Sequence, residues 1–215
     1  RAGSSSSSGW SFPRNEPDDA LRGGTGNVID KTVASPEAAV ADIPDGATIM
    51  IGGFGAAGQP AELIDALIAQ GATDLTIVNN NAGNGETGLA ALLKARRVRR
   101  ILCSFPRQVD SQVFDALYRT GAIELELVPQ GNLAERIRAA GAGIGAFFTP
   151  TSYGTELAEG KETRINDGRP YVLEYPIRAD FAFIKALRAD RWGNLVYRKT
   201  ARNFGPVMAT AARCT

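Results

Sequence analysis

Four glycines within seven residues, from Gly52 to Gly58, follow a short apolar run over 48–51. Pro60 then opens an amphipathic segment over 61–70, so this stretch predicts a strand, a glycine-rich turn and a helix. Glycine adopts positive φ and lets the backbone approach a ligand closely, and a helix N-terminus favours negative charge. The spacing matches neither the dinucleotide-binding pattern nor the phosphate-binding loop that ends in Gly-Lys-Ser/Thr. A tight turn without a ligand is the alternative, although such a turn does not need the large aromatic Phe54 inside it.

The length and composition predict one folded domain of ordinary globular character, with two small domains as the alternative. Of the 215 residues, 44% are hydrophobic and 22% are charged. Lys and Arg (24) nearly balance Asp and Glu (23), so we expect no general nucleic-acid binding. The two cysteines, Cys103 and Cys214, are too few for a disulfide framework and favour a reducing, cytoplasmic location. No apolar run approaches transmembrane length, and we expect no membrane partner.

The absence of histidine narrows the chemistry that this chain can perform. It excludes serine–histidine and cysteine–histidine catalysis, histidine proton shuttles and histidine-ligated metals within the chain. Acid–base or nucleophilic catalysis must therefore use a carboxylate, a lysine, a tyrosine, a thiol or the backbone, or else groups of a partner chain. We therefore expect no metal site.

Both ends of the chain differ in character from the rest. Residues 1–27 carry no hydrophobic periodicity and many disorder-favouring residues, so we interpret them as a disordered or non-native N-terminal extension. Residues 28–212 are interpreted as the folded domain. Residues 213–215 follow without a capping element, an atypical end for which truncation is one interpretation.

Between the ends, strand-like and helix-like segments alternate. The predicted strands span 48–51, 74–78, 99–104, 123–128 and 144–148, and the predicted helices span 61–70, 88–95, 110–119 and 132–140. This order predicts an α/β fold with an open, mostly parallel sheet flanked by helices. Asn132 is predicted to cap the last helix, because Glu135 stands at the capping-box spacing, and Gly141 is predicted to end it.

Beyond Pro150 the pattern changes. Residues 164–175 contain an Asn-Asp-Gly turn between strand-like flanks, and apolar runs over 181–186 and 195–197 flank Trp192-Gly193-Asn194. We therefore predict a hairpin-rich C-terminal part on the same sheet.

Four polar or glycine-rich loops follow the first four predicted strands. They are residues 52–58, 79–86, 105–108 and 129–132. In an open α/β sheet the ligand crevice lies outside the carboxyl ends of the strands, so we expect these loops to form one site. The loops are rich in amide donors and poor in charge, which suits a carbonyl or carboxylate substrate better than a metal ion. The alternative for each loop alone is ordinary turn chemistry, since Asn and Gly dominate turns.

Several motifs carry a resemblance to family I CoA-transferases. Residues 45–60 look like the α-subunit signature, whose core is G-G-F-x-x-x-G-x-P, with every position present. The resemblance covers about residues 28–212 and continues in N-N-A-G (80–83), P-Q-G-N-L-A-E-R-I-R (129–138), G-I-G-A-F-F-T-P (143–150), Y-G-T-E-L-A-E-G (153–160) and the segment 192–204. Within the family, N-A-G-N-G-E-T-G-L-A-A-L-L and C-S-F-P-R-Q most resemble the 3-oxoadipate type, and acetoacetate-type enzymes are the near competitor. The resemblance implies the CoA-transferase (NagB-like) fold.

The resemblance implies transfer of CoA from succinyl-CoA to 3-oxoadipate, in the degradation of aromatic compounds, with release of succinate. A glutamate would carry the CoA as a glutamyl-CoA thioester, which splits one hard exchange into easier steps. CoA would come and go as a thioester substrate, and no cofactor would be permanently bound. The family's glutamate stands in an S-E-N-G motif of the β subunit, and this chain has no such motif. We therefore expect this chain to be an α subunit that is active only with a β subunit, in an α2β2 heterotetramer.

The resemblance also implies roles for particular residues. Gln130 matches the position whose side-chain amide faces the oxyanion, and Asn80 and Asn81 lie in the motif beside the reacting acyl group. The predicted CoA contacts are Gly52, Gly53, Phe54, Gly55, Ala56, Ala57 and Gly58.

Other candidates rest on residue type and context. Arg107 and Lys199 are candidates for contacts with a carboxylate or a CoA phosphate, with a solvated surface cation as the alternative. Glu86 lacks the sequence context of the nucleophile and is interpreted as a carboxylate in the first turn of a helix. Cys103 is interpreted as a buried strand thiol.

Two other function classes remain open. One is a CoA-ligand-binding protein or regulator of the same fold without turnover, and the other is a single-chain enzyme that uses its own carboxylate.

Overall fold

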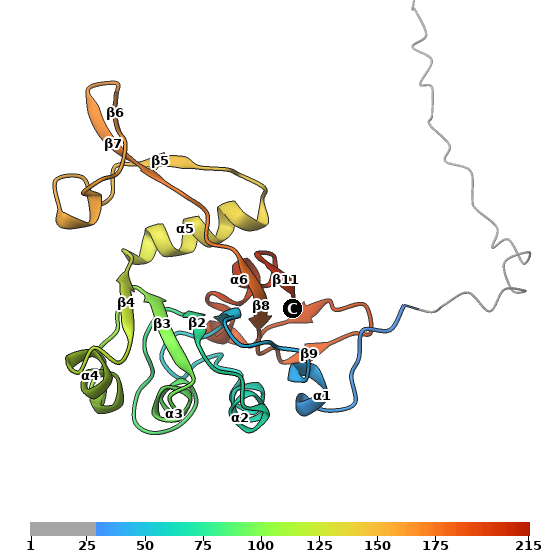
Figure 1. The fold of residues 1–215 in the computed structure, drawn as a ribbon. Helices are drawn as coiled ribbons and strands as arrows, with labels where there is room; N and C mark the ends of the chain where they lie inside the picture. The colour runs from blue at the N-terminus through green and yellow to red at the C-terminus, as the bar shows by residue number, and fades with distance from the viewer. Residues whose placement is uncertain (1–28) are drawn as a thin grey trace, which may run out of the picture. The chain divides into compact units, whose positions relative to one another are not determined.

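Six parallel strands form the central sheet in a computed structural model that describes residues 29–215 (Figure 1). Their order is β11-β8-β1-β2-β3-β4, and every neighbouring pair is parallel. The strands are β1 (Thr48–Ile51), β2 (Leu75–Val78), β3 (Val98–Cys103), β4 (Glu124–Leu127), β8 (Ala179–Phe183) and β11 (Ala212–Cys214). The predicted open, mostly parallel α/β sheet is therefore confirmed. The predicted extension over residues 1–27 lies outside the described residues.

Helices cover both faces of the central sheet (Figure 1). One face carries α1 (Pro36–Val40), α2 (Ala61–Gln70), α3 (Leu89–Lys94) and α4 (Gln112–Arg119), and the other carries α5 (Gln130–Gly141) and α6 (Gly205–Ala209). Ile49 and Ile51 of β1 join the core that includes α2 to α4, whereas Met50 joins the core that includes α5 and α6. Side chains of a strand alternate between its faces, so a strand covered on both sides needs the continuous apolar run that predicts β1.

Helix α5 begins earlier than the capping-box pattern predicts. Pro129 is its N-cap residue and Gln130 is its first residue, so the prediction that Asn132 caps the helix is wrong. Asn132 is buried instead, and its Nδ2 donates to Oε1 of Glu174 at 3.1 Å. Glu135 pairs with Arg138 one turn on, at 2.6 Å. A long-range bond to a buried carboxylate takes the place of the local cap.

The C-terminal part contributes to three sheets rather than one. β5 (Phe147–Thr149), β6 (Thr163–Asn166) and β7 (Arg169–Glu174) form an antiparallel sheet of order β5-β7-β6, and β9 (Arg188–Ala189) pairs with β10 (Leu195–Val196). The predicted turn at 166–168 joins β6 to β7 as expected. The prediction that these hairpins lie on the central sheet is wrong. β8 joins that sheet as a parallel strand beside β1, where its buried Ala179, Ala182 and Phe183 pack into the two cores, and β11 pairs in parallel with β8 at the edge.

The chain's last strand lies at one edge of the central sheet. In β11, Ala212 pairs with Ala179 and Cys214 pairs with Phe181. The fold therefore continues past residue 212, and truncation at 213–215 stays a prediction.

Two short 3₁₀ helices, η2 (Glu156–Ala158) and η3 (Lys199–Arg202), complete the described elements. Among these elements, no helix combines the length and the apolar character needed to cross a membrane.

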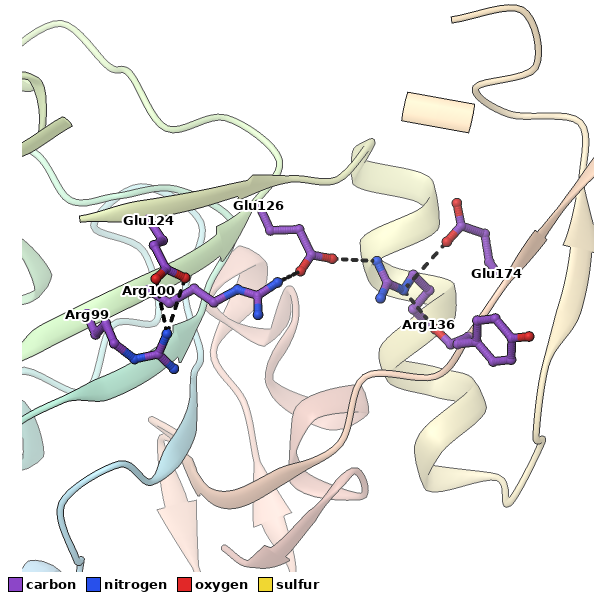
Figure 2. Close-up of polar contacts among 7 residues, drawn as sticks. Arg99, Arg100, Glu124, Glu126, Arg136 and Glu174 are labelled. Atoms are coloured by element: carbon purple, nitrogen blue, oxygen red, sulfur yellow. Dashed lines mark hydrogen bonds and ion pairs between the residues drawn. The ribbon is translucent and has the colours of Figure 1, made fainter. Parts of the chain in front are cut away.

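Ion pairs and hydrogen bonds join α5 to the central sheet and to the antiparallel sheet that contains β7 (Figure 2). Arg136 of α5 donates to Glu126 of β4 through Nη1 at 3.0 Å and to the carbonyl oxygen of Tyr175 through Nε at 2.7 Å. Glu174, the last residue of β7, is only 2% exposed, and Lys161 Nζ lies 2.8 Å from its Oε1. Its other oxygen lies 3.7 Å from Arg136 Nε. Because a buried carboxylate is stable only when it is paired, this cluster fixes α5 against β7.

Replacing Glu174 by Ala is expected to lower the free energy of unfolding by about 3 kcal/mol, because Lys161 and Arg136 lose a buried partner. Glu162→Ala is the matched control: Glu162 pairs with Arg164 in solvent, and a loss below about 0.5 kcal/mol is expected. Urea denaturation of both variants measures the two losses. Equal losses would mean that the Glu174 cluster does not hold α5 to β7.

Candidate functional site

Four loops meet around one open cavity at the carboxyl edge of the central sheet. The cavity has a volume of about 980 Å³, which is the size of small-molecule sites. Each predicted loop contributes to its wall, and the lining residues are Phe54, Gly55, Asn80, Ser104, Phe105, Arg107, Gln108, Val109 and Gln130. The predicted convergence of the four loops is therefore confirmed, whereas the roles of single residues stay predictions.

Three consecutive buried asparagines at the end of β2 connect the strand ends beneath this edge. Nδ2 of Asn79 donates to the carbonyl oxygen of Ile51 at 2.5 Å, and its Oδ1 accepts from the backbone N–H of Asn81 at 2.9 Å. The carbonyl oxygen of Asn80 accepts from the backbone N–H of Ser104 at 3.2 Å. Buried amides cost free energy unless they are bonded. The asparagine run therefore fixes the carboxyl ends of β1, β2 and β3 relative to one another.

The side-chain amides of Asn80 and Gln130 are held together in the cavity wall. Nε2 of Gln130 donates to Oδ1 of Asn80 at 2.8 Å, and Oγ of Ser104 donates to the same oxygen at 2.8 Å. An amide nitrogen carries two N–H groups, so one N–H of Gln130 remains for a ligand. Among the described residues, Nδ2 of Asn80 has no partner. The site therefore offers neutral, oriented donors, which suit an oxygen on which negative charge develops.

The glycine-rich loop is a tight turn that presents Phe54 at the rim of the cavity. Phe54 and Ala57 exchange backbone hydrogen bonds of 3.0 and 3.2 Å, and Gly53 and Gly55 adopt φ values of 131° and 61°. Of the seven predicted CoA contacts, Phe54 and Gly55 line the cavity. Gly52 and Gly53 are buried within the turn, and the remaining three lie outside the lining.

The same loop packs against the segment that includes η3. Nδ2 of Asn203 donates to the carbonyl oxygen of Ala57 at 2.8 Å. At Gly58, with φ at 81°, an added Cβ would lie 2.5 Å from the carbonyl oxygen of Ala201. Glycine is therefore required at this close approach of two backbones. Lys199 belongs to η3 and does not line the cavity.

Arg107 supplies a positive charge to the cavity wall. Its Nε donates to Oδ1 of Asp115 on α4 at 2.7 Å, and Arg119 Nη2 lies 3.8 Å from the other oxygen of Asp115. The side chain of Arg107 remains 57% exposed. Arg107 is thus a paired cation in the wall of the cavity, rather than a cation surrounded by solvent alone.

Three other predicted residues lie outside the cavity lining. Asn81 is buried, and its Nδ2 has no partner in the described part of the chain. Cys103 is buried in β3, and burial raises the pKa of its thiol to about 12, as expected of an inert strand thiol. Glu86 is exposed and pairs with Lys94 at 3.0 Å. Its predicted place in the first turn of a helix is wrong, because the positive φ of Gly88 delays the start of α3.

Part of the cavity wall is not found by pattern alone. The predicted strand 99–104 includes Ser104, and the predicted loop 105–108 stops short of Val109, yet both line the cavity. A hydroxyl directly after the apolar run Ile101-Leu102-Cys103, at the carboxyl end of the strand, is the signal that identifies Ser104.

Comparison with known proteins places residues 33–215 in one family. The sequence profile of the family "Coenzyme A transferase" matches residues 33–215. The chain is 72% identical over 186 residues to a subunit of the 3-oxoadipate CoA-transferase of Pseudomonas putida, covering 86% of this chain and 80% of that protein. It is 50% identical over 184 residues to a succinyl-CoA:3-ketoacid coenzyme A transferase subunit of Xanthomonas campestris pv. campestris (strain B100), covering 85% and 75%.

A solved structure of a variant of the decarboxylase AibA/AibB has the same fold. It matches with a TM-score of 0.72 at 27% identity, over 84% of this chain and 71% of that chain. The fold thus occurs in proteins named for different reactions, so the reaction must be argued from the site.

Gly58→Ala should destabilise the protein more than Gly55→Ala. Both positions have positive φ, which costs an alanine about 1 kcal/mol. Only at Gly58 does the new methyl group meet a backbone carbonyl, and that overpacking adds about 1–3 kcal/mol. Urea unfolding measures both variants. Equal destabilisation would contradict the close packing of this loop against η3.

At pH 8, iodoacetamide should alkylate Cys214 and leave Cys103 unmodified. The thiolate is the reactive form, and with a pKa raised to about 12 the buried Cys103 stays protonated at this pH, whereas Cys214 is exposed. Peptide mass spectrometry of the folded protein measures the two sites. Similar labelling rates would contradict the buried position of Cys103, and labelling of both after unfolding is the control.

Proposed function

The chain belongs to the coenzyme A transferase family, and from this premise we propose that it is the α subunit of an enzyme that moves CoA from succinyl-CoA to 3-oxoadipate, in the degradation of aromatic compounds. The observation that carries the proposal is the bonded pair of amides, Asn80 and Gln130, in the wall of an open cavity. The higher identity to a 3-oxoadipate enzyme than to a 3-ketoacid enzyme supports the choice of acceptor.

In this proposal, the chain's own contribution to the chemistry is to stabilise an oxyanion. Attack on a thioester carbonyl places negative charge on its oxygen, and the unbonded N–H groups of Gln130 and Asn80 donate to it. Oδ1 of Asn80 already accepts from Gln130 and Ser104, so the donors are oriented before the substrate arrives. Donors that need no reorganisation stabilise the transition state more than the substrate.

The covalent steps belong to a glutamate of a partner subunit. Its carboxylate attacks the carbonyl of succinyl-CoA, which forms an anhydride and releases CoA thiolate. The thiolate attacks the glutamyl carbonyl, releases succinate and leaves a glutamyl-CoA thioester, and 3-oxoadipate then takes the CoA by the reverse route. Among the described residues, the cavity lining includes no carboxylate, and this supports a nucleophile on another chain. We propose an α2β2 assembly in which an S-E-N-G segment of the β subunit faces the cavity.

The glycine-rich loop contacts CoA in this arrangement. Phe54 is 51% exposed at the rim, and an exposed aromatic beside a cavity suits cover by a ligand or a partner. Binding energy from the non-reacting part of CoA can then be used at the thioester. CoA comes and goes as a substrate, with no resident cofactor. The unpaired Cys103 and Cys214 suit a reducing cytoplasm.

Two alternatives stay open. The acceptor could be acetoacetate or another 3-oxoacid, since the same amides serve any thioester. A CoA-ligand-binding protein without turnover is the second candidate, and the observation that favours it is that the described lining offers donors but no carboxylate nucleophile.

The test is co-purification of the chain with a β subunit, followed by an assay of CoA transfer from succinyl-CoA to a panel of 3-oxoacids. We expect transfer to 3-oxoadipate from the complex and none from either chain alone. Transfer by this chain alone would mean that it uses its own carboxylate. CoA binding without transfer by any complex would favour the non-catalytic protein.

Gln130→Ala should lower kcat of the complex by about 10²–10³ with little effect on assembly, because one oriented donor to the oxyanion is lost. Gln112→Ala is the matched control, since Gln112 is also the first residue of a helix, is exposed and lies outside the cavity lining. Steady-state kinetics and size-exclusion chromatography measure the two effects. An unchanged kcat would remove Gln130 from this role.

A further inference from the structure

Arg107 is the charged side chain of a cavity wall that is otherwise neutral. Among the described residues that line the cavity, the others are the apolar Phe54, Phe105 and Val109, a glycine, and four with hydroxyl or amide groups. All three apolar side chains are at least half exposed. A single cation in such a wall can distinguish ligands by whether they carry a second negative group.

The contact with Asp115 leaves most of the guanidinium available. Asp115 takes the Nε–H of Arg107 at 2.7 Å, and among the described residues neither Nη group has a partner. A guanidinium has five N–H donors in a planar fork, so four remain, and the fork matches a carboxylate in a bidentate pair. An ammonium group would offer no such geometry.

The backbone around Arg107 is held in place from two sides. The backbone N–H of Gln108 donates to Oγ of Ser111 at 2.6 Å. The backbone N–H of Asp110 donates to Oδ1 of Asn84 at 2.9 Å. These bonds tie the loop to α4 and to the loop after β2, so the position of the Arg107 side chain is set by the fold as well as by Asp115.

We propose that Arg107 binds a second carboxylate, remote from the reacting carbonyl, and that Asp115 orients Arg107 for this contact. The proposal rests on the proposed CoA transfer and deepens it, because it makes the substrate class dicarboxylic. Succinyl-CoA and 3-oxoadipate both carry such a carboxylate, and acetoacetate carries none. The amides of Asn80 and Gln130 hold the reacting end, and Arg107 holds the far end.

The test measures the choice between two acceptors by the complex with the β subunit. With succinyl-CoA as donor, 3-oxoadipate and acetoacetate compete for one enzyme form, so their ratio of kcat/KM is independent of any change in loading by the donor. Arg107→Gln should lower this ratio about 10- to 100-fold, as expected for a lost hydrogen bond to a charged group. Arg107→Lys should recover part of it, because the charge returns without the fork.

Variants of Asp115 and Arg119 separate the orientation of Arg107 from its charge. Asp115→Ala should lower the same ratio, by less than Arg107→Gln, because Arg107 keeps its charge but loses its orienting partner. Arg119→Gln is the matched control. Arg119 is the other cation near Asp115 but lies outside the cavity lining, so its loss should leave the ratio of kcat/KM for the two acceptors unchanged. A general loss of folding would lower turnover of both acceptors and leave the ratio intact.

A binding measurement decides the proposal without turnover. Ligand-observed NMR should detect adipate bound to the wild-type complex, weaker binding of hexanoate, and loss of adipate binding in Arg107→Gln. If the wild-type complex transfers CoA to neither acceptor, the proposed function fails, and the adipate result still supports or overturns the role of Arg107. An unchanged acceptor ratio, or adipate binding that does not depend on Arg107, overturns the inference.

Discussion

The hydrogen bonds of three buried asparagines, Asn79 to Asn81, are the interaction on which the rest of the site depends. Nδ2 of Asn79 reaches the end of β1, and the carbonyl oxygen of Asn80 accepts from the backbone after β3. Oδ1 of Asn80 then accepts from Ser104 and from Gln130 at the start of α5. Because a buried amide that loses its partner is costly, these bonds hold three strand ends and one helix in a single arrangement.

A second set of contacts keeps α5, and with it Gln130, in place from the far side. The buried Glu174 pairs with Arg136, as Figure 2 shows. It also pairs with Lys161 and accepts from Asn132, so charge compensation at the end of β7 fixes the helix that begins with Gln130. Oriented donors are effective in catalysis because they do not reorganise. The two networks thus hold in place the amides to which the proposed mechanism assigns the oxyanion, in a chain without histidine and with no carboxylate in the described cavity wall.

The sequence predicts what depends on local pattern. The apolar run before Gly52 and the alternation of strands and helices lead to a parallel sheet with four loops at its carboxyl edge, as the structure has it. The predictions that fail concern residues whose partners lie far along the chain. Asn132 has the spacing of a helix cap, but Glu174, 42 residues on, takes its amide. In the same way the short apolar pattern of β8 suits a hairpin or a parallel strand, and only its pairing with β1, far back along the chain, decides between them.

The central claim is that this chain supplies the donors of a CoA-transfer site whose nucleophile lies on a partner. The most direct measurement is to load the complex with succinyl-CoA, trap the activated carboxylate with hydroxylamine, and locate the hydroxamate by peptide mass spectrometry. We expect the modification on a glutamate of the β subunit, with none on this chain. A hydroxamate on Glu86, or on any other carboxylate of this chain, would contradict the claim.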